Sequence, residues 1–342
     1  MDCFFFQTTM NLNELSNDVI ETILGYIKSE PYTICASSVC KRWNQLSKKL
    51  VVKSKARRTE SPFVIAIEFF ASNGHLSILK WLHQIWPNNM GWTDSQLTYY
   101  AARAGHLDIL KWAREKNLPW DEYTCKNAAL TGQLACLQWL HDNGCPWDES
   151  TTENAALGGH LNVLKYARSA GCPSWLDSIC IAAAQSGSIE ALQWILENDG
   201  SWDERAAAAA ASEGHWELLK WAHDYGCPMV DERVCAAAVK NLPMLKWLRE
   251  NGSSWDGSLY MSAAEHGQLE TMKWAHENGC EWNSYCAETA ARVGSFEIIK
   301  WITKTGLEMN DEDCIFAAED YGHWEIAKFL KNKIGKDSDD DE

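Results

Sequence analysis

The sequence predicts an all-α protein in which a short N-terminal helical segment precedes an α-solenoid of about ten helix-turn-helix repeats. Three observations carry this prediction. A Gly followed by a polar and then an apolar residue recurs every 27 to 28 residues, after a first step of 31. An aromatic residue stands seven positions after each Gly. A pair of Ala residues usually stands three or four positions before it. Self-similarity at such a period is typical of stacked helical repeats.

Each repeat is expected to be two helices joined at this Gly, because Gly suits the left-handed conformation that ends a helix. The Ala pair lets neighbouring first helices approach closely. The second helix carries an acid in its first turn and often a Lys three residues later, as in Asp108 and Lys111, which suits the helix dipole and an ion pair. The recurring residues are Gly74, Gly105, Gly132, Gly159, Gly187, Gly214, Gly267, Gly294 and Gly322, with a shortened copy around Asn241.

The pattern AAxxGHLExxKxL over residues 63–334 resembles the second half of the ankyrin repeat. It departs from that family in its shorter period and in lacking the T-P-L-H segment and part of the β-hairpin finger. A short, Trp-rich form of this kind is similar to the ankyrin-like arrays of large DNA viruses and amoebae. The resemblance implies a protein-binding solenoid, although the missing fingers prevent transfer of the usual finger-based surface. The atypical first and last copies are expected to act as capping repeats.

Residues 1–50 do not follow the repeat period and form two amphipathic helical patterns, with a cap on the solenoid as one interpretation. The segment also resembles the F-box, most specifically in VCKRW, although Ser16 stands where that family has Pro. This resemblance implies docking onto the Skp-type adaptor of a cullin-RING ubiquitin ligase. The matching residues are Leu15, Ile20, Ile23, Leu24, Ile27, Val39, Cys40, Trp43 and Leu46.

Two charged stretches flank the repeats. A basic linker is expected over residues 51–62. It overlaps the basic run KKLVVKSKARR, which is either a solvated segment or a nuclear import signal. An acidic tail over 335–342 is expected to be disordered.

Composition narrows the function. The net charge is −16; residues 1–60 hold nine Lys/Arg against six Asp/Glu, so the rest carries −19. A polyanion is repelled by such a surface, and we expect no nucleic-acid partner. No apolar run is long enough to span a bilayer, and the start lacks the basic region of a secretory signal. Thirteen Cys without a CxxC pair favour reduced thiols. We therefore expect a cytoplasmic protein, with the nucleus as the alternative, and no membrane partner.

The motifs of common enzymes are missing from the sequence: it has no phosphate-binding loop, nucleophile elbow or HExxH. We therefore expect no enzyme activity and no cofactor. His-x-x-x-Cys occurs three times, first as His141 and Cys145. Two ligands are too few for a structural zinc site, and sister copies replace both residues, so no metal is expected. Cys125, Cys180, Cys286 and Cys314 are expected to be small buried hydrophobes.

Binding specificity should lie at positions that vary between repeats. On the first helices the candidates for target binding are Tyr123, Arg205, Arg233, Tyr260 and Tyr285. The sequence thus predicts the substrate-recognition subunit of a cullin-RING ligase, monomeric outside the complex, that binds the Skp-type adaptor and an unidentified target protein. The alternatives are a scaffolding repeat protein, or a decoy of the host ubiquitin machinery, without a ligase role.

Overall fold

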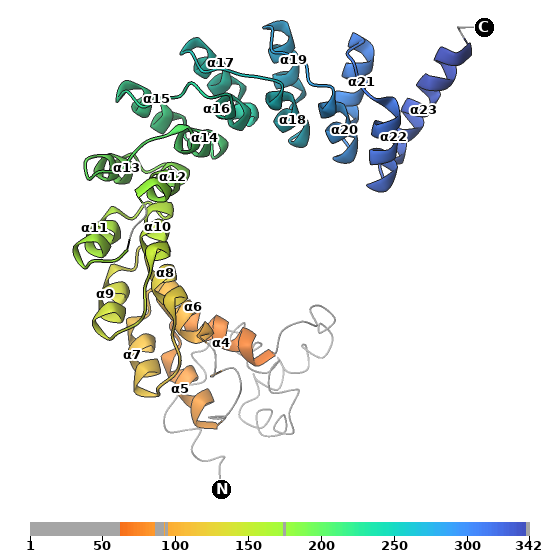
Figure 1. Cartoon of the computed structure of the whole chain (residues 1–342). Coiled ribbons are helices and arrows are strands. Elements are labelled where there is room, and N and C mark those ends of the chain that lie inside the picture. Colours follow the sequence, from red (N-terminus) through yellow and green to blue (C-terminus); the bar gives the residue numbers. More distant parts are fainter. Residues whose placement is uncertain (1–61, 86–91, 93–94, 174–175, 340–342) are drawn as a thin grey trace. The chain divides into compact units, whose positions relative to one another are not determined.

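The computed structural model describes residues 62–85, 92, 95–173 and 176–339, which fall into two compact units, Met1–Ser174 and Trp175–Glu342. Figure 1 labels the helices of each unit. The predicted F-box-like segment and nearly all of the basic linker lie outside the described residues. Within the described ranges every regular element is a helix, as predicted, and no helix is both long and apolar enough to cross a bilayer.

The described part of the first unit contains four helix pairs. Their bounds are α4 Pro62–Ser72, α5 Leu76–Ile85, α6 Gln96–Ala104, α7 Leu107–Glu115, α8 Glu122–Leu130, α9 Leu134–Asp142, α10 Glu149–Leu157 and α11 Leu161–Ser169.

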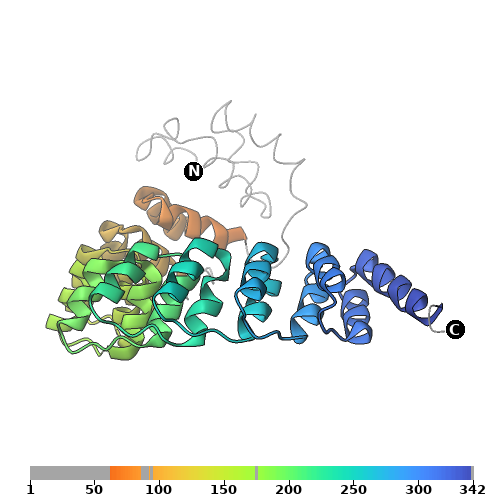
Figure 2. The ribbon, with the colours of Figure 1, turned by 90° about the horizontal axis from the view of Figure 1, so that it is seen from above.

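The second unit contains six pairs, stacked in succession (Figure 2). Their bounds are α12 Leu176–Ser186, α13 Ile189–Leu196, α14 Glu204–Ser212, α15 Trp216–Asp224, α16 Glu232–Ala237 with the 3-10 turn η4 Ala238–Lys240, α17 Leu242–Glu250, α18 Ser258–Glu265, α19 Leu269–Glu277, α20 Tyr285–Arg292, α21 Phe296–Thr305, α22 Asp311–Asp320 and α23 Trp324–Asp339.

In both units the first helices of the repeats form an inner layer and the second helices an outer layer (Figure 1). Neighbouring inner helices contact one another far more than neighbouring outer helices do. The Ala pairs explain this, since Ala128, Ala129, Ala263 and Ala264 are fully buried and leave room for close helix approach. The predicted α-solenoid is therefore confirmed within each unit.

The repeated Gly residues all adopt the predicted left-handed conformation, with φ between +66° and +81°. At Gly294 this conformation comes with a second constraint. The His323 ring of the next repeat lies over the glycine, and its Nε2 is 3.1 Å from the Arg292 carbonyl oxygen. A Cβ at Gly294 would lie 2.6 Å from His323 Cε1. The repeated Gly therefore ends a helix and, at Gly294, also provides the surface on which the His of the next repeat packs.

The irregular copy keeps the architecture without its Gly. The helix α16 tightens into η4, and Asn241 then begins the next helix by accepting the backbone N–H of Met244 at 3.1 Å. A side-chain cap replaces the left-handed turn, which is why this copy is shorter.

The C-terminal end departs from the expected disordered tail. The helix α23 continues to Asp339, past Gly335, which does not adopt a left-handed conformation. Two ion pairs join α23 to α22 just before Gly335, Lys333–Asp311 at 2.7 Å and Lys331–Glu319 at 2.5 Å.

Candidate target-binding surface

Most inner helices begin at an Asp or Asn whose side chain caps the helix. Asp203 Oδ1 accepts the backbone N–H of Arg205 at 3.0 Å and of Ala206 at 3.1 Å, and Asp148 Oδ1 accepts that of Ser150 at 3.0 Å. Such caps satisfy donors that the helix leaves unpaired. They also place the residue two positions later at an equivalent site in each repeat that has such a cap. We call these residues the rim column: Tyr123 and Ser150 in the first unit, and Arg205, Arg233, Ser258, Tyr285 and Glu312 in the second.

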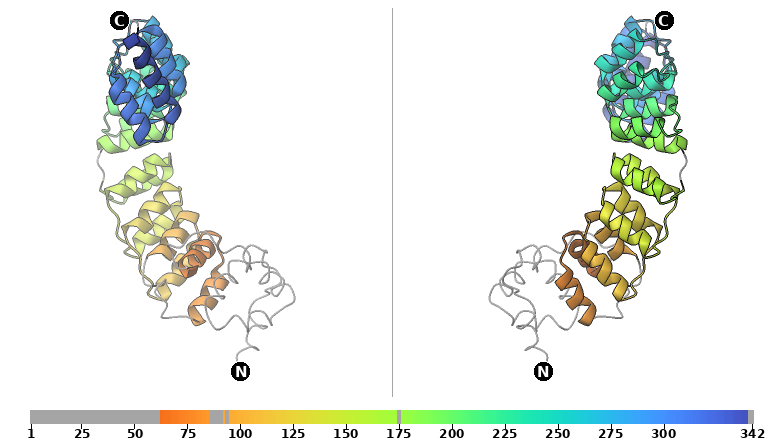
Figure 3. Two further views of the ribbon diagram at one scale, coloured as in Figure 1. Left: turned by 90° about the vertical axis from the view of Figure 1, so that its right-hand side faces the viewer. Right: turned by 90° about the vertical axis from the view of Figure 1, so that its left-hand side faces the viewer.

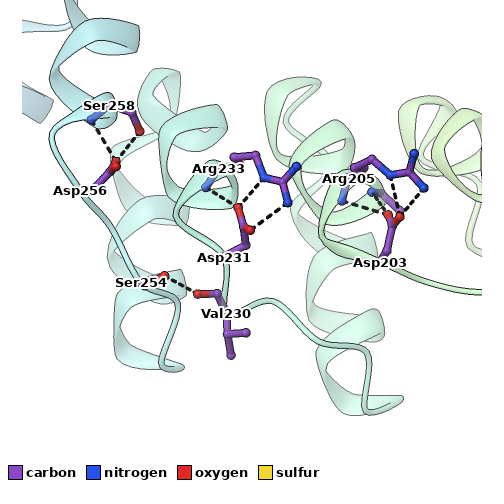
Figure 4. Close-up of polar contacts among 9 residues, drawn as sticks. Asp203, Arg205, Val230, Asp231, Arg233, Ser254, Asp256 and Ser258 are labelled. Atoms are coloured by element: carbon purple, nitrogen blue, oxygen red, sulfur yellow. Dashed lines mark hydrogen bonds and ion pairs between the residues drawn. The ribbon is translucent and has the colours of Figure 1, made fainter.

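The two Arg residues of the rim column fold back onto their caps (Figure 4). Arg233 donates from Nε to Asp231 Oδ1 at 2.7 Å and from its terminal nitrogen to Oδ2 at 2.9 Å. Arg205 reaches Asp203 Oδ2 at 2.7 Å through both Nε and a terminal nitrogen. The side chains of Arg205 and Arg233 nevertheless remain 53% and 56% exposed, respectively. Two oriented guanidinium groups are therefore presented to solvent.

These ion pairs change the acidity of the capping carboxyl groups. Hydrogen bonding from the Arg233 side chain lowers the pKa of Asp231 below its ordinary value. At Asp203, partial burial acts to raise the pKa, but hydrogen bonds from the side chain and backbone of Arg205 outweigh it and the pKa is lowered. Both carboxylates are therefore ionised at neutral pH, and the rim presents matched positive and negative charge.

The two Tyr residues of the rim column are exposed, Tyr123 to 53% and Tyr285 to 70%. Lys126 Nζ lies 5.6 Å from the centroid of the Tyr123 ring. Large exposed rings at fixed backbone positions offer contact area with few rotatable bonds, as binding surfaces favour.

Tyr260 is a correction to the predicted set, because its side chain is fully buried. Its hydroxyl donates to the Cys280 carbonyl oxygen at 3.3 Å, and its ring packs edge-on against Trp282 with centroids 4.8 Å apart. The reason is helical periodicity. Tyr260 stands four residues after its cap Asp256, whereas the exposed candidates stand two after theirs, and two residues rotate a helix by about 200°. The residue two positions after the cap in this repeat is the half-buried Ser258, which the sequence analysis missed and which counting from the cap identifies.

The His-x-x-x-Cys pairs serve the joints between repeats. The His141 ring stacks on Trp147 with centroids 3.9 Å apart. The thiol of Cys280 donates to the carbonyl oxygen of Asp256 at 3.3 Å. Cys172, at the same position in a copy that has Arg168 in place of the His, donates to that of Asp148 at 3.2 Å. Burial raises the pKa of Cys280 to about 11 and that of Cys172 to about 12, which keeps both as thiol donors. Among the described residues there is no group of three or more His, Cys, Asp or Glu arranged to hold a metal ion.

The loop Trp residues also link successive repeats. Trp202 Nε1 donates to the Pro228 carbonyl oxygen at 3.1 Å, and Trp282 Nε1 to that of Glu308 at 2.9 Å. The four Cys residues expected to be buried hydrophobes are buried. The aromatic ladders and these thiols therefore build the stack, and the candidate surface is the rim column.

These features define an α-solenoid repeat protein with a variable, exposed rim. No family model and no curated protein matches the chain. Among solved structures it is similar to the crystal structure of the human ASB11 ankyrin repeat domain, at 19% sequence identity and a TM-score of 0.38. The match covers 47% of this chain and 84% of that domain.

Proposed function

We propose that the repeats bind a target protein through the rim column. The observation that carries the proposal is a constant cap followed by a varied side chain: Asp or Asn recurs, while the residue two positions on is an exposed Tyr, Arg or Glu or a half-buried Ser. A constant frame with variable contacts suits recognition, and Tyr and Arg dominate the binding energy of many interfaces.

The spacing of the rim column favours an extended segment of the target. Neighbouring packed helices lie about 8–10 Å apart, which three residues of extended chain span at about 3.3 Å each. Arg205 and Arg233 would then contact residues about three apart in such a segment. Each guanidinium is already paired with a carboxylate, so a target that offers hydrogen-bonding and aromatic groups suits the rim better than a bare phosphate does.

The rim is tested by affinity capture with the full chain as bait, followed by mass spectrometry. The variant Arg205→Ser/Arg233→Ser/Tyr285→Ser gives each site the side chain that Ser258 has naturally and leaves the caps intact. The matched control, Lys220→Ser/Lys273→Ser/Lys300→Ser, removes three outer-layer side chains that form exposed ion pairs. We expect the control to retain the captured proteins and the rim variant to lose them. Retention by both would contradict a target site on the rim.

We propose further that the chain is the substrate-recognition subunit of a cullin-RING ubiquitin ligase, with its N-terminal segment bound to the Skp-type adaptor. Support for this comes from the F-box-like residues between Leu15 and Leu46. An apolar pair of helices docked in a partner's groove at one end would leave the rim free for a target. Adaptor binding without any captured target would instead favour the decoy alternative.

Deleting residues 1–50 distinguishes the ligase-subunit hypothesis from the scaffold hypothesis. An independently docking segment contributes little to the stack, so the truncated protein is expected to melt within a few degrees of the full chain by circular dichroism. A segment that caps the solenoid shields its first repeat from water, and its removal would lower the melting temperature sharply. A sharp drop would favour the scaffold alternative.

A further inference from the structure

The two units of the chain differ sharply in charge. The first unit, Met1–Ser174, holds 17 Lys/Arg against 16 Asp/Glu, a net charge of +1. The second unit, Trp175–Glu342, holds 14 Lys/Arg against 31 Asp/Glu, a net charge of −17. The negative charge of the chain therefore belongs to the unit whose rim column carries the two Arg residues. A field of this sign attracts and orients basic partners.

Around these two Arg residues the carboxylates outnumber the guanidinium groups. Glu204 and Glu232 stand one position after the caps Asp203 and Asp231, which take up the ion pairs of the Arg side chains. Within the described part of the chain neither Glu has an ion pair of its own. The pKa of Arg233 is raised by its hydrogen bonds to Asp231 and, more weakly, by the Glu204 and Glu232 carboxylates. Two carboxylates one repeat apart are thus left to bind cationic groups of a partner.

The exposed face of the same helices continues from the Arg residues to small apolar side chains. Ala208 and Ala236 stand one helical turn after Arg205 and Arg233 and are half-buried. Their helices, α14 and α16, are neighbours in the inner layer of the stack that the left view of Figure 3 shows from the end with α22 and α23. Figure 4 shows Arg205 and Arg233 at corresponding places on the two helices. Because the Ala side chains are small, the backbone of a bound segment can approach both helices closely.

The spacing of the repeats determines which extended conformation fits this face. Neighbouring packed helices lie about 8–10 Å apart, so equivalent contacts recur at that interval. Side chains alternate along a β-strand, and residues three apart therefore point to opposite sides. A polyproline II helix has about three residues per turn and rises about 3.1 Å per residue, so residues three apart lie on one side, about 9 Å from each other. Of these two conformations, only polyproline II brings every third side chain to the same position on successive repeats.

We propose that the target segment held by α14 and α16 adopts the polyproline II conformation and carries a Lys or Arg at every third position. The basic side chains bind Glu204 and Glu232. Pro or other apolar residues between them contact Ala208 and Ala236. The N–H groups that the two rim Arg residues do not use on their caps donate to carbonyl oxygens of the segment. This inference rests on the proposed function of the rim column and names the chemistry of its target.

The spacing is tested by fluorescence anisotropy of labelled eight-residue peptides titrated with the full chain. The probe is Pro-Pro-Lys-Pro-Pro-Lys-Pro-Pro. The comparison peptide, Pro-Pro-Lys-Pro-Lys-Pro-Pro-Pro, has the same composition with its Lys residues two apart. We expect the probe to bind about fivefold more tightly, because the comparison peptide reaches only one of the two carboxylates at a time. Equal binding of the two peptides, or no binding of the probe, would overturn the proposal, and neither result depends on the folding of a variant.

A matched pair of variants locates the site. Glu204→Gln/Glu232→Gln removes the two carboxylates and should abolish the preference for the probe. Glu250→Gln/Glu277→Gln changes the net charge by the same amount at the exposed ends of α17 and α19, and should leave the preference intact. A preference that survives the first change, or that both changes remove equally, contradicts the assignment.

The target chemistry and the proposed function fail separately. If affinity capture depends on the rim column but the two peptides bind alike, the polyproline II assignment is wrong and the rim remains the target site. If capture does not depend on the rim column, the proposed function itself is wrong, and the inference about its target fails with it.

Discussion

Replacing Gly294 by Ala is expected to destabilise the second unit by about 2–3 kcal/mol, whereas the same replacement at Gly322 should cost only about 1 kcal/mol. Both glycines have φ +79°, so both variants lose stability because Ala disfavours the left-handed conformation. They differ in what the new Cβ would meet. At Gly294 it would approach the His323 ring to 2.6 Å, but at Gly322 nothing lies within 4 Å. The ring can move only by giving up its contact with the Arg292 carbonyl oxygen, worth about 1 kcal/mol.

Urea unfolding of the full chain, followed by circular dichroism, measures this difference. The His323→Ala change removes the obstacle. Gly294→Ala should therefore cost less stability in the His323→Ala protein than in the wild type. Equal destabilisation at Gly294 and Gly322 would show that the His ring imposes no packing constraint between repeats. The comparison is internal, because both positions belong to the same unit and share one backbone conformation.

The helical repeats could be predicted from sequence because the same packing problem recurs in each copy. The Gly-to-aromatic spacing and the Ala pairs stand in most copies, and their structural roles follow directly from left-handed helix ends and close helix approach. The fate of the thiols was also predictable, since a lone Cys at a repeat position more often packs than reacts.

The rim could be predicted only in part. Tyr260 and Tyr285 look equivalent as aromatic residues near the start of a first helix, yet one is fully buried and the other 70% exposed. The difference depends on counting from the capping residue, and the caps became certain only with the hydrogen bonds of Asp203, Asp231 and their counterparts. The contact of His323 on Gly294 lies between two repeats, and no pattern within one repeat reveals it.

The ends of the array were the least predictable part. Periodicity describes a residue by its place in a repeat, but Trp324, two positions after Gly322, is 65% exposed. The same residue type at the same position is half-buried in Trp216. Among the residues that the structure describes, the ion pairs that join α23 to α22 likewise have no counterpart in the other repeats.

The largest expected effect on binding is at Trp43, which lies with Cys35, Val39 and Leu46 on one predicted helix face. If that face docks in the groove of the Skp-type adaptor, the indole is its largest apolar group. Truncating a buried aromatic anchor of an interface costs about 2 kcal/mol or more, which corresponds to at least a thirtyfold loss of affinity. Leu15→Ala, at the start of the segment, should weaken binding in the same direction. Trp324→Ala, an exposed Trp at the other end of the chain, is the matched control and should leave adaptor binding unchanged.

The central claim is that one chain joins a ubiquitin-ligase adaptor to a target held by the repeats. Isothermal titration of the full chain with a purified Skp-type adaptor tests it most directly. The account predicts saturable one-to-one binding that Trp43→Ala weakens at least thirtyfold and Trp324→Ala does not. A wild-type chain that does not bind the adaptor, or a Trp43→Ala chain that binds equally well, would contradict it.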